Sequence, residues 1–584
     1  MKLGVIALDY DGTTAQHDRL DPAVRDAIAD ARTRGITVII VTGRSLDELR
    51  RVAGELHFVD VVVAENGAVL HFPGNDYTTV LAAPVPTALI DELRRRGITA
   101  AHGRCLVDCA TSDALQILDV IRQMELPLVL AFNRSRVMVL PQGVSKATGL
   151  QVALDMLRLS PHNAVAVGDA ENDHALLQLV EVGAAVEWGS PTLQAAADLT
   201  IRGTGPSAVS QYVRTIAGSG RMPVPPKARR RLRLGYTEDG REFSLAVRGR
   251  NVLIAGDAKS GKSWIAGLLC EQLILHGYSM CVLDAEGDYR SLEALPGVTI
   301  LGGEDPAPTP RELLSALRYP DPDRSVVIDL SRVVHDQKID YIRSVLPALN
   351  VMRRHTGLPH RIVVDEAHYF LHDAAARHLL DFETNGYTVV TYCASRLPPE
   401  LLAATEVMLV TCESNPAEIE ALCRRCASGQ QVQGGGERWS GLAHLSLGQA
   451  VALPITEEAG GELKVFNIGQ RLTPHVRHRQ KYVDVPVTES RAFQFAGNGS
   501  APHRVRTLRQ FVDALEHGSM PALGGYLRRG DFSRWIADVF GDNALAQELR
   551  KEEQRFRSHV DDDVVPEIAN AIRARYDLIE DDMA

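Results

Sequence analysis

The sequence lacks the features of membrane, secreted and disulfide-stabilised proteins. No apolar run reaches the roughly 18 residues that a spanning helix requires, which excludes a transmembrane protein. Eight cysteines are scattered over 584 residues, which does not fit a disulfide framework. Acidic residues outnumber basic ones, 74 against 63, and the net charge of −11 argues against indiscriminate binding to nucleic acid. Asp9 and Asp11 interrupt the apolar start before a secretory signal can form, so we expect a cytoplasmic protein.

The sequence does contain ample apolar material for folded domains. Hydrophobic residues make up 45% of the chain and charged residues 23%, which excludes disorder along the whole chain. The length predicts about four units, or three larger ones. Strand-like and helical segments alternate through residues 1–217 and again through 235–495, whereas residues 496–584 look helical. This alternation predicts an α/β protein with parallel sheets and helices on both faces.

Four polar elements lie at the ends of predicted strands, or at the start of a helix, in the first region. The motif DYDGT at 9–13 directly follows an apolar strand, and Thr42 ends the next strand along the chain. Lys146 lies near the start of a helix, and the motif GDAEND at 168–173 follows a further strand. Because open α/β sheets bind ligands at the carboxyl ends of their strands, we expect all four elements at one sheet edge.

Taken in order, these motifs resemble those of the haloacid dehalogenase-type phosphatases, and the ending GDxxND is similar to their Cof-like, class IIB branch. The resemblance covers about residues 1–215 and implies a Rossmann-like core with a small α/β cap at about 72–140 that selects the substrate. Cap side chains could contact a substrate or could be ordinary surface and core residues; the candidates are Cys105, Asp108, Cys109, Asn133 and Arg134.

The resemblance also implies a role for each motif residue, and the chemistry of the side chains favours the same roles. Asp9 is the expected nucleophile, which forms an aspartyl-phosphate, and Asp11 the general acid and base. Thr42 is expected to hold a phosphate oxygen. Lys146 is expected to neutralise charge in the transition state, with Asn172 assisting orientation.

The same motifs imply a magnesium site. Mg²⁺ prefers oxygen ligands, which Asp9, Asp169 and the Asp11 carbonyl would supply, with Asp173 close by. Because all four motifs are intact, we expect an active phosphomonoester phosphatase that acts on a phosphorylated small molecule.

A second set of motifs predicts a nucleotide site. The motif GDAKSGKS at 256–263 follows a predicted strand and opens an apolar helix, which is the context of a P-loop. Backbone amides and the helix N-terminus would bind the phosphates of ATP, Lys262 would reach the β and γ oxygens, and Ser263 would bind Mg²⁺. The predicted nucleotide-binding residues of the loop are Gly256, Asp257, Ala258, Lys259, Ser260, Gly261, Lys262 and Ser263.

A strand at 361–364 supplies the partner of this loop. It ends on Asp365, expected in the metal shell, and Glu366, expected to activate the attacking water. Together with the segment VLDAEGDY at 282–289, these motifs look like the HerA/FtsK superfamily of ring-forming ATPases. The resemblance covers about 235–470 and implies a RecA-like P-loop ATPase domain that could form a homo-oligomeric ring. Tyr392 stands where such proteins usually carry a glutamine, which weakens the inference that the ATP state is relayed to DNA in their usual way.

Basic stretches and single arginines are open to two interpretations. Residues 218–234 contain six basic residues, three prolines and no acidic residue, which fits a solvated linker or a contact strip for a phosphate-bearing partner or a neighbouring domain. Residues 471–482 contain no acidic residue and could grip phosphates or form an exposed linker. The candidates for an arginine finger, each equally well a surface arginine, are Arg424, Arg425 and Arg471.

The remaining segments predict a loop and a small helical domain. Residues 430–437 are rich in glycine and glutamine and predict a loop. In the tail, Phe532, Trp535, Ile536 and Val539 fall on one helical face, which indicates a core. The predicted domains are therefore a phosphatase at 1–217, a linker at 218–234, an ATPase at 235–495 and a C-terminal helical domain at 496–584.

We expect a bifunctional hydrolase in which a Mg²⁺-dependent phosphatase is fused to an ATP-binding and ATP-hydrolysing domain. One alternative is a nucleic-acid translocase, or an end-processing or defence enzyme, with an accessory phosphatase. Another is a phosphometabolite-sensing domain that gates an ATPase. The sequence does not identify the phosphorylated substrate, the oligomeric state or a nucleic-acid partner.

Overall fold

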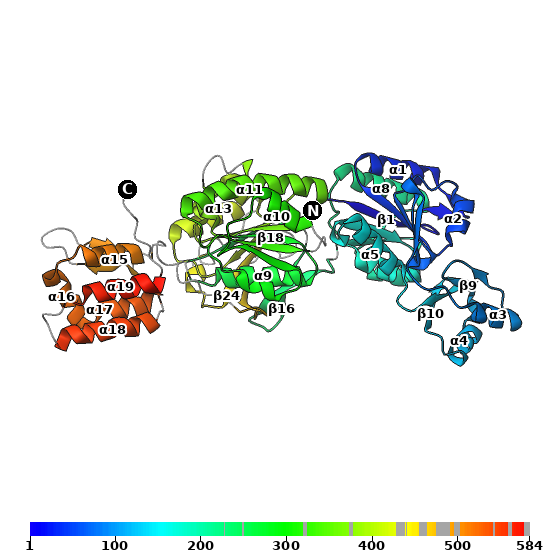
Figure 1. Ribbon diagram of the computed structural model, residues 1–584. Coiled ribbons are helices and arrows are strands. Elements are labelled where there is room, and N and C mark those ends of the chain that lie inside the picture. The colour runs from blue at the N-terminus through cyan, green and yellow to red at the C-terminus, as the bar shows by residue number, and fades with distance from the viewer. Residues whose placement is uncertain are drawn as a thin grey trace.

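Figure 1 shows the computed structural model, in which three units follow one another: an amino-terminal unit, a central unit and a carboxyl-terminal unit. The structure describes residues 1–226, 228–247, 250–257, 259–318, 324–372, 378–427, 439, 441–454, 464–474, 487, 491–495, 503–540, 543–558 and 563–576. Ala258, the loop predicted at 430–437 and most of the basic stretch at 471–482 lie outside these residues. Among the described residues, no helix combines the length and apolar character needed to cross a membrane.

The amino-terminal unit is built on an eight-stranded sheet with the order β14-β13-β12-β1-β4-β5-β6-β7. Its strands are β1 (Val5–Asp9), β4 (Thr37–Val41), β5 (Val61–Ala64), β6 (Val69–Phe72), β7 (Tyr77–Val80), β12 (Ala164–Gly168), β13 (Val182–Val186) and β14 (Leu199–Ile201), with a short hairpin of β2 (Ala15–Gln16) and β3 (Arg19–Leu20) beside them. Its helices are α1 (Pro22–Thr33), α2 (Leu46–Ala53), α5 (Lys146–Leu157), α6 (His174–Leu179), α7 (Pro191–Ala196) and α8 (Pro206–Ser219).

The local sequence explains how these elements form. Asp21 caps α1 by accepting from the Ala23 amide, and Pro22 occupies the first helical position, where its missing N–H is not needed. Strand β1 is buried along its whole length because β4 and β12 pair with it in parallel on either side. The carboxyl ends of these three central strands therefore meet at one edge of the sheet, as the sequence predicted.

A smaller sheet with the order β10-β11-β9-β8 forms the cap. The cap elements are α3 (Thr87–Arg95), β8 (Ala101–His102), β9 (Val107–Ala110), α4 (Ala114–Gln123), β10 (Leu128–Asn133) and β11 (Arg136–Pro141). The predicted cap boundary at residue 72 lies too early, because β7 pairs with β6 and extends the main sheet. Residues up to Val80 thus belong to the core, and the separate cap begins after them.

The central unit contains an eleven-stranded sheet with the order β16-β15-β25-β24-β23-β17-β22-β21-β18-β20-β19. Its strands are β15 (Arg231–Thr237), β16 (Glu242–Ala246), β17 (Val252–Ala255), β18 (Met280–Asp284), β19 (Val298–Gly302), β20 (Ser325–Asp329), β21 (Arg361–Val364), β22 (Tyr387–Thr391), β23 (Val407–Val410), β24 (Gln449–Pro454) and β25 (Lys464–Ile468). Its helices are α9 (Lys262–Leu275), α10 (Pro310–Arg318), α11 (His335–Thr356), α12 (Pro399–Ala404) and α13 (Pro416–Ala427).

The carboxyl-terminal unit is mostly helical. It consists of β26 (Phe493–Phe495), β27 (His503–Val505), α15 (Leu508–Glu516), α16 (Met520–Arg529), α17 (Asp531–Trp535), a π-helical turn at Ile536–Phe540, α18 (Asn543–Ser558) and α19 (Val565–Tyr576). Phe532, Trp535 and Ile536 are buried in its core and Val539 packs against it, as the helical pattern predicted. Strand β26 also packs in this core, so the unit begins before residue 496, the predicted boundary.

The predicted linker at 218–234 is shorter than its composition suggests, and part of it is a contact strip. Helix α8 extends to Ser219, and β15 already begins at Arg231 within the central sheet. Arg229 pairs with Asp198 at 2.6 Å, and Arg230 donates to backbone carbonyls at the end of α6. Of the alternatives considered for this segment, the structure shows contact with a neighbouring domain.

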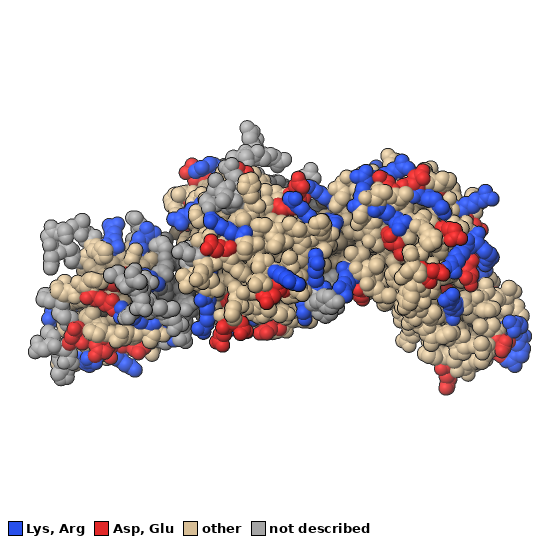
Figure 2. All heavy atoms as spheres, turned by 45° about the horizontal axis from the view of Figure 1, so that its top comes forward, with Lys and Arg blue, Asp and Glu red and all other residues tan. Residues whose placement is uncertain are grey.

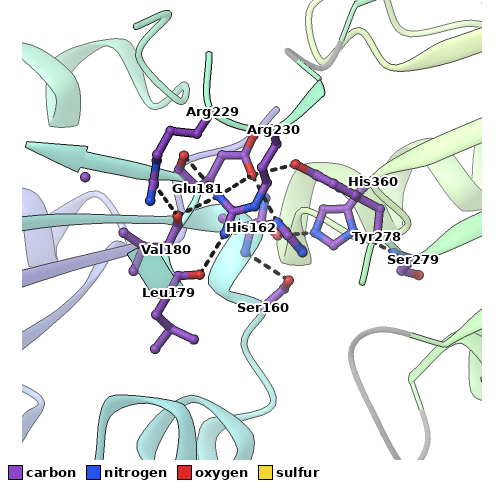
Figure 3. A network of polar contacts seen from close by, with 12 residues as sticks. Ser160, His162, Leu179, Val180, Glu181, Arg229, Arg230, Tyr278, Ser279 and His360 are labelled. Atoms are coloured by element: carbon purple, nitrogen blue, oxygen red, sulfur yellow. Dashed lines mark hydrogen bonds and ion pairs between the residues drawn. The ribbon is translucent and has the colours of Figure 1, made fainter. Parts of the chain in front are cut away.

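The two α/β units meet through buried polar side chains (Figure 3). Glu181 Oε2 accepts a hydrogen bond from the Tyr278 hydroxyl at 2.7 Å and lies 3.0 Å from His162 Nδ1. The rings of His162 and Tyr278 stack with centroids 3.9 Å apart. His360 Nε2 lies 3.2 Å from Asn163 Oδ1. All these residues precede strands or lie at their amino ends, so the edges of the two sheets opposite the motifs face each other.

Surface charge is mixed on the face shown in Figure 2. Lysine and arginine side chains alternate with aspartate and glutamate over all three units in this view. The net charge of −11 is therefore not gathered into one patch on that face.

Candidate active site and nucleotide site

A buried cluster of charges lies at the carboxyl edge of the amino-terminal sheet. Asp9 ends β1, and Asp169 and Asp173 lie directly after β12. Lys146, the first residue of α5, donates to Asp9 at 2.5 Å and to Asp173 at 2.7 Å. All four side chains are at most 4% exposed. The sequence motifs thus converge at one point, although more than 130 residues separate Asp9 from Lys146.

Burial and mutual repulsion perturb the acids of this cluster. Burial raises the pKa of Asp9 well above its ordinary value, against the attraction of Lys146. Burial, and then the charge of Asp173, raise the pKa of Asp169 to about 6. Burial alone would lower the pKa of Lys146, but Asp173 and Asp9 raise it, so the lysine stays charged. The cluster holds three carboxylates and one ammonium, and therefore favours a further cation.

The donor set of this cluster fits Mg²⁺. Oxygen atoms of Asp9, Asp169 and Asp173 lie within 4.8 Å of one another, and all three residues are buried. Among the described residues, Asp9 Oδ2 is buried without a hydrogen-bond partner. Hard oxygen ligands are those that Mg²⁺ prefers, and a cation here would satisfy that oxygen.

Asp11 lies at the mouth of the site and is held by Arg44. The guanidinium of Arg44 donates to both carboxylate oxygens of Asp11, at 2.7 and 2.6 Å, and also contacts Asp18. The Asp11 side chain is 37% exposed. Thr42 is fully buried, and its hydroxyl accepts from the Arg44 amide at 3.1 Å. Arg44 lies two residues after Thr42, and the sequence alone did not predict that it pairs with Asp11.

Asn172 contacts a loop that the sequence motifs do not include. Its side-chain amide donates to Asn66 Oδ1 at 3.2 Å. The preceding Glu65 is buried and accepts from the backbone amides of Arg104 at 2.8 Å and Cys105 at 2.7 Å. Glu65 therefore anchors the chain that leads into β9 of the cap. Its position is the sequence signal that could have identified Glu65, because it directly follows β5 at the same edge of the sheet.

The cap candidates fall into two groups. Cys105 and Cys109 are buried, Asp108 pairs with Arg136 within the cap, and Asn133 stands opposite Arg136 at the end of the β10–β11 hairpin. Arg134, at the tip of that hairpin, instead contacts Asp169 in the core. The structure thus brings Arg134 to the acidic cluster, whereas the two cysteines lie inside the cap.

The P-loop connects β17 to α9 in the central unit. Gly256 has a φ of 145°, and a side chain there would meet the Thr411 hydroxyl. Lys262 is buried and donates to the Asp257 carbonyl at 2.7 Å, across its own loop. Ser260 bonds to the same carbonyl at 2.7 Å, and Ser263 lies in the first turn of α9. Gly261, with a φ of 105°, ends the loop at the helix N-terminus. Lys259 reaches the Val539 carbonyl of the carboxyl-terminal unit at 3.1 Å.

Asp365 and Glu366 follow β21, two strands from β17 in the sheet. Both are buried, and Glu366 adopts a φ of 46°. His368 Nδ1 lies 3.1 Å from the Thr391 hydroxyl and 3.6 Å from Glu366 Oε2. Burial lowers the pKa of His368 to about 4, so it is neutral at physiological pH. Its ring also packs on Tyr392 with centroids 4.2 Å apart, which places Tyr392 beside the acidic pair.

The arginine-finger candidates differ in their surroundings. The side chains of Arg471 and Glu271 are each 1% exposed and form an ion pair at 2.9 Å on the side of α9. This burial is the opposite of what a finger reaching into another subunit requires. Arg424 is 73% exposed and lies 3.4 Å from Glu420. The side chain of Arg425 lies outside the described residues.

Comparisons with known proteins match both α/β units. A family model for haloacid dehalogenase-like hydrolases matches residues 6–96 and 111–213, and a model for the helicase HerA central domain matches residues 246–355. A phosphoglycolate phosphatase of Natronomonas pharaonis is 30% identical over 205 residues, which cover 33% of this chain and 88% of that protein. A phosphoglycolate phosphatase of Halorubrum lacusprofundi is 28% identical over 218 residues, covering 34% of this chain and 89% of that protein.

These relatives match only about a third of the chain, yet nearly the whole of their own length. One from Methanothermobacter thermautotrophicus, also a phosphoglycolate phosphatase, is 27% identical and is covered over 98% of its length. The residues matched by the haloacid dehalogenase-like family model lie in the unit that holds Asp9, Lys146 and Asp169. Through this amino-terminal unit the chain belongs to the haloacid dehalogenase-like hydrolases. A HerA-type central domain follows that unit in the sequence.

Proposed function

We propose that the amino-terminal unit is a Mg²⁺-dependent phosphomonoester phosphatase that works through an aspartyl-phosphate. The observation that carries the proposal is the buried cluster in which Lys146 contacts Asp9 and Asp173 while Asp9 Oδ2 has no hydrogen-bond partner among the described residues. Asp9 and Asp169 would hold Mg²⁺ with the Asp11 carbonyl, and Asp173 stands beside them. When bound, Mg²⁺ supplies the positive charge that allows a phosphate dianion to approach these carboxylates.

The side chains divide the remaining work. Asp9 attacks the phosphorus atom, and the bond from phosphorus to the leaving alcohol breaks. Asp11 donates a proton to that alcohol and later takes one from the water that hydrolyses the aspartyl-phosphate. For this, Asp11 must exchange its pairing with Arg44 for the substrate, and its exposed position at the mouth supports such movement. Lys146 stabilises charge on the transferred group, while Thr42 and Asn172 orient it.

A direct test is the release of phosphate from p-nitrophenyl phosphate with Mg²⁺ and without ATP. Asp9→Asn removes the nucleophile and is expected to abolish release, whereas Asp119→Asn on the exposed face of α4 is expected to leave it intact. Equal rates for wild type and Asp9→Asn would refute the proposal. The names of the relatives make 2-phosphoglycolate the first natural substrate to assay.

We further propose that the central unit binds and hydrolyses ATP. The P-loop precedes α9, so the backbone amides of this loop and the helix N-terminus can bind phosphates, with Lys262 and Ser263 as the charged and metal-binding groups. Asp365 would complete the metal shell, and Glu366 would activate water. Lys262 now donates to its own loop, and it must leave the Asp257 carbonyl to reach a nucleotide.

The HerA-type match also favours a nucleic-acid-dependent motor as a second candidate function. In that case double-stranded DNA should increase the rate of ATP hydrolysis, and a ring should form in solution. The measurement is ATP turnover with and without DNA, together with the mass of the particle. An unchanged rate and a monomeric particle would exclude this candidate.

A further inference from the structure

Arg134 projects from the cap onto the acidic cluster of the core. It lies at the tip of the β10–β11 hairpin, where its φ of 54° forms the tight turn. Its guanidinium contacts Asp169 Oδ2. A side chain at Gly12 would come within 2.9 Å of the same guanidinium. The cap therefore places a positive charge directly over the motif that carries the nucleophile.

The hairpin tip is fixed on both sides. The Arg134 amide donates to Glu171 Oε2 of the core at 3.3 Å, and the Thr111 hydroxyl of the cap donates to the Arg134 carbonyl at 3.2 Å. Further along the hairpin, the Met138 sulfur would be 3.1 Å from a side chain at Gly43. The cap hairpin therefore brings one apolar side chain, Met138, and one cationic side chain, Arg134, close to the core loops that carry the motifs.

We propose that Arg134 is a specificity residue that selects small phosphomonoesters whose alcohol portion carries a carboxylate. This inference rests on the proposed phosphatase function. In the proposed phosphatase, Lys146 and the metal site of the core would bind the phosphoryl group. The Arg134 guanidinium on the cap could therefore bind the other end of the substrate. Asp169, once engaged by Mg²⁺, leaves guanidinium donors available. A planar guanidinium binds a carboxylate through two parallel hydrogen bonds, which a neutral alcohol cannot supply.

The test compares two phosphonates of the same length, neither of which can be hydrolysed. 3-Phosphonopropionate carries a carboxylate, and propylphosphonate carries a methyl group in its place. Their dissociation constants are measured by calorimetry on the full chain with Mg²⁺. We expect wild type to favour the carboxylated compound by about tenfold, the effect of one charge-assisted hydrogen-bonding contact. Arg134→Ala should bind both compounds equally, and Arg134→Lys should retain part of the preference.

Arg136→Ala is the matched control. Arg136 lies two residues along the same hairpin, but it pairs with Asp108 inside the cap and should keep the wild-type preference. The same ratio should appear in kcat/KM for 2-phosphoglycolate against ethyl phosphate. A wild type without preference, or an Arg134→Ala variant that weakens both phosphonates equally, would overturn the inference. Failure of the phosphatase itself would show separately, as equal phosphate release by wild type and Asp9→Asn.

Discussion

Glu181 is expected to hold the amino-terminal and central units together. Its carboxylate accepts from the Tyr278 hydroxyl at 2.7 Å, faces His162 Nδ1 at 3.0 Å and lies 3.5 Å from Arg230 (Figure 3). The Glu181 side chain is 7% exposed, so water does not replace a lost partner easily. Glu181→Ala removes the partner that these three polar groups share.

The structure sets the size of the expected effect. Breaking a buried, hydrogen-bonded charge contact by removing one partner costs about 3–5 kcal/mol, because a buried partner, here the Tyr278 hydroxyl, is left without a hydrogen bond. Tyr278→Phe removes only one donor and leaves Glu181 with His162 and Arg230, so about 1 kcal/mol is expected. Glu304→Ala serves as the control, since the Glu304 side chain is 80% exposed.

Urea unfolding followed by tryptophan fluorescence measures these differences in free energy. Trp188, which donates to the Gly12 carbonyl, reports on the amino-terminal unit, and Trp264 on α9 reports on the central unit. Trypsin provides a second measurement, because Arg229 and Arg230 are engaged at the junction and should be cleaved faster in Glu181→Ala. If Glu181→Ala is no more destabilising than Glu304→Ala and cleavage is unchanged, the junction does not join the units as described.

Three further predictions concern the central unit. Lys262→Ala should abolish ATP turnover and leave phosphate release from p-nitrophenyl phosphate unchanged; loss of both activities would show that the sites are coupled. Burial raises the pKa of Glu413 from 4.5 to about 8, helped by Asp257. The folded chain thus keeps a proton that the unfolded chain releases between these values, and stability falls as pH rises from 4.5 to about 8. This dependence of the free energy of unfolding on pH amounts to up to about 1.4 kcal/mol per pH unit, and Glu413→Gln should remove it. Urea unfolding at pH 5 and pH 8 measures it, and an unchanged dependence in Glu413→Gln would contradict the role given to Glu413. Arg471→Met should lower the free energy of unfolding by about 3–5 kcal/mol, because it leaves the buried Glu271 carboxylate without its ion-pair partner. If Arg471 were instead a finger acting between subunits, mixing Arg471→Met with a Glu366→Gln variant would restore ATP turnover, and we expect no such restoration.

Local patterns were sufficient to predict the strands that carry the motifs. In the central unit, β21 begins and ends at the residues expected from the apolar run at 361–364. In the amino-terminal unit, the closeness of Asp9 and Asp169 followed from one rule, that parallel strands present their carboxyl ends at one edge, whereas Lys146 reaches them from the start of helix α5. Both successes depend on buried parallel strands, whose sequences are continuously apolar.

Features that depend on distant partners could not be predicted. The partner of Arg471 is Glu271, 200 residues earlier, and no periodicity connects them. The basic segment at 218–234 predicted charge, but nothing local shows that Arg229 and Arg230 bind carbonyls at the end of α6. Strand β7 is only partly buried at the edge of the main sheet, so its sequence does not distinguish core from cap.

The junction constrains how the two proposed activities can be related. Asn163 precedes β12 and Glu181 precedes β13, while Tyr278 and His360 precede β18 and β21. The sheets therefore meet at the edges opposite the two proposed sites, which face away from each other. A product released at one site must pass through solvent to reach the other. Any effect of ATP on the phosphatase must instead cross the contacts between the two units. Glu181 makes several of these contacts, so Glu181→Ala is expected to weaken such an effect while both sites remain complete.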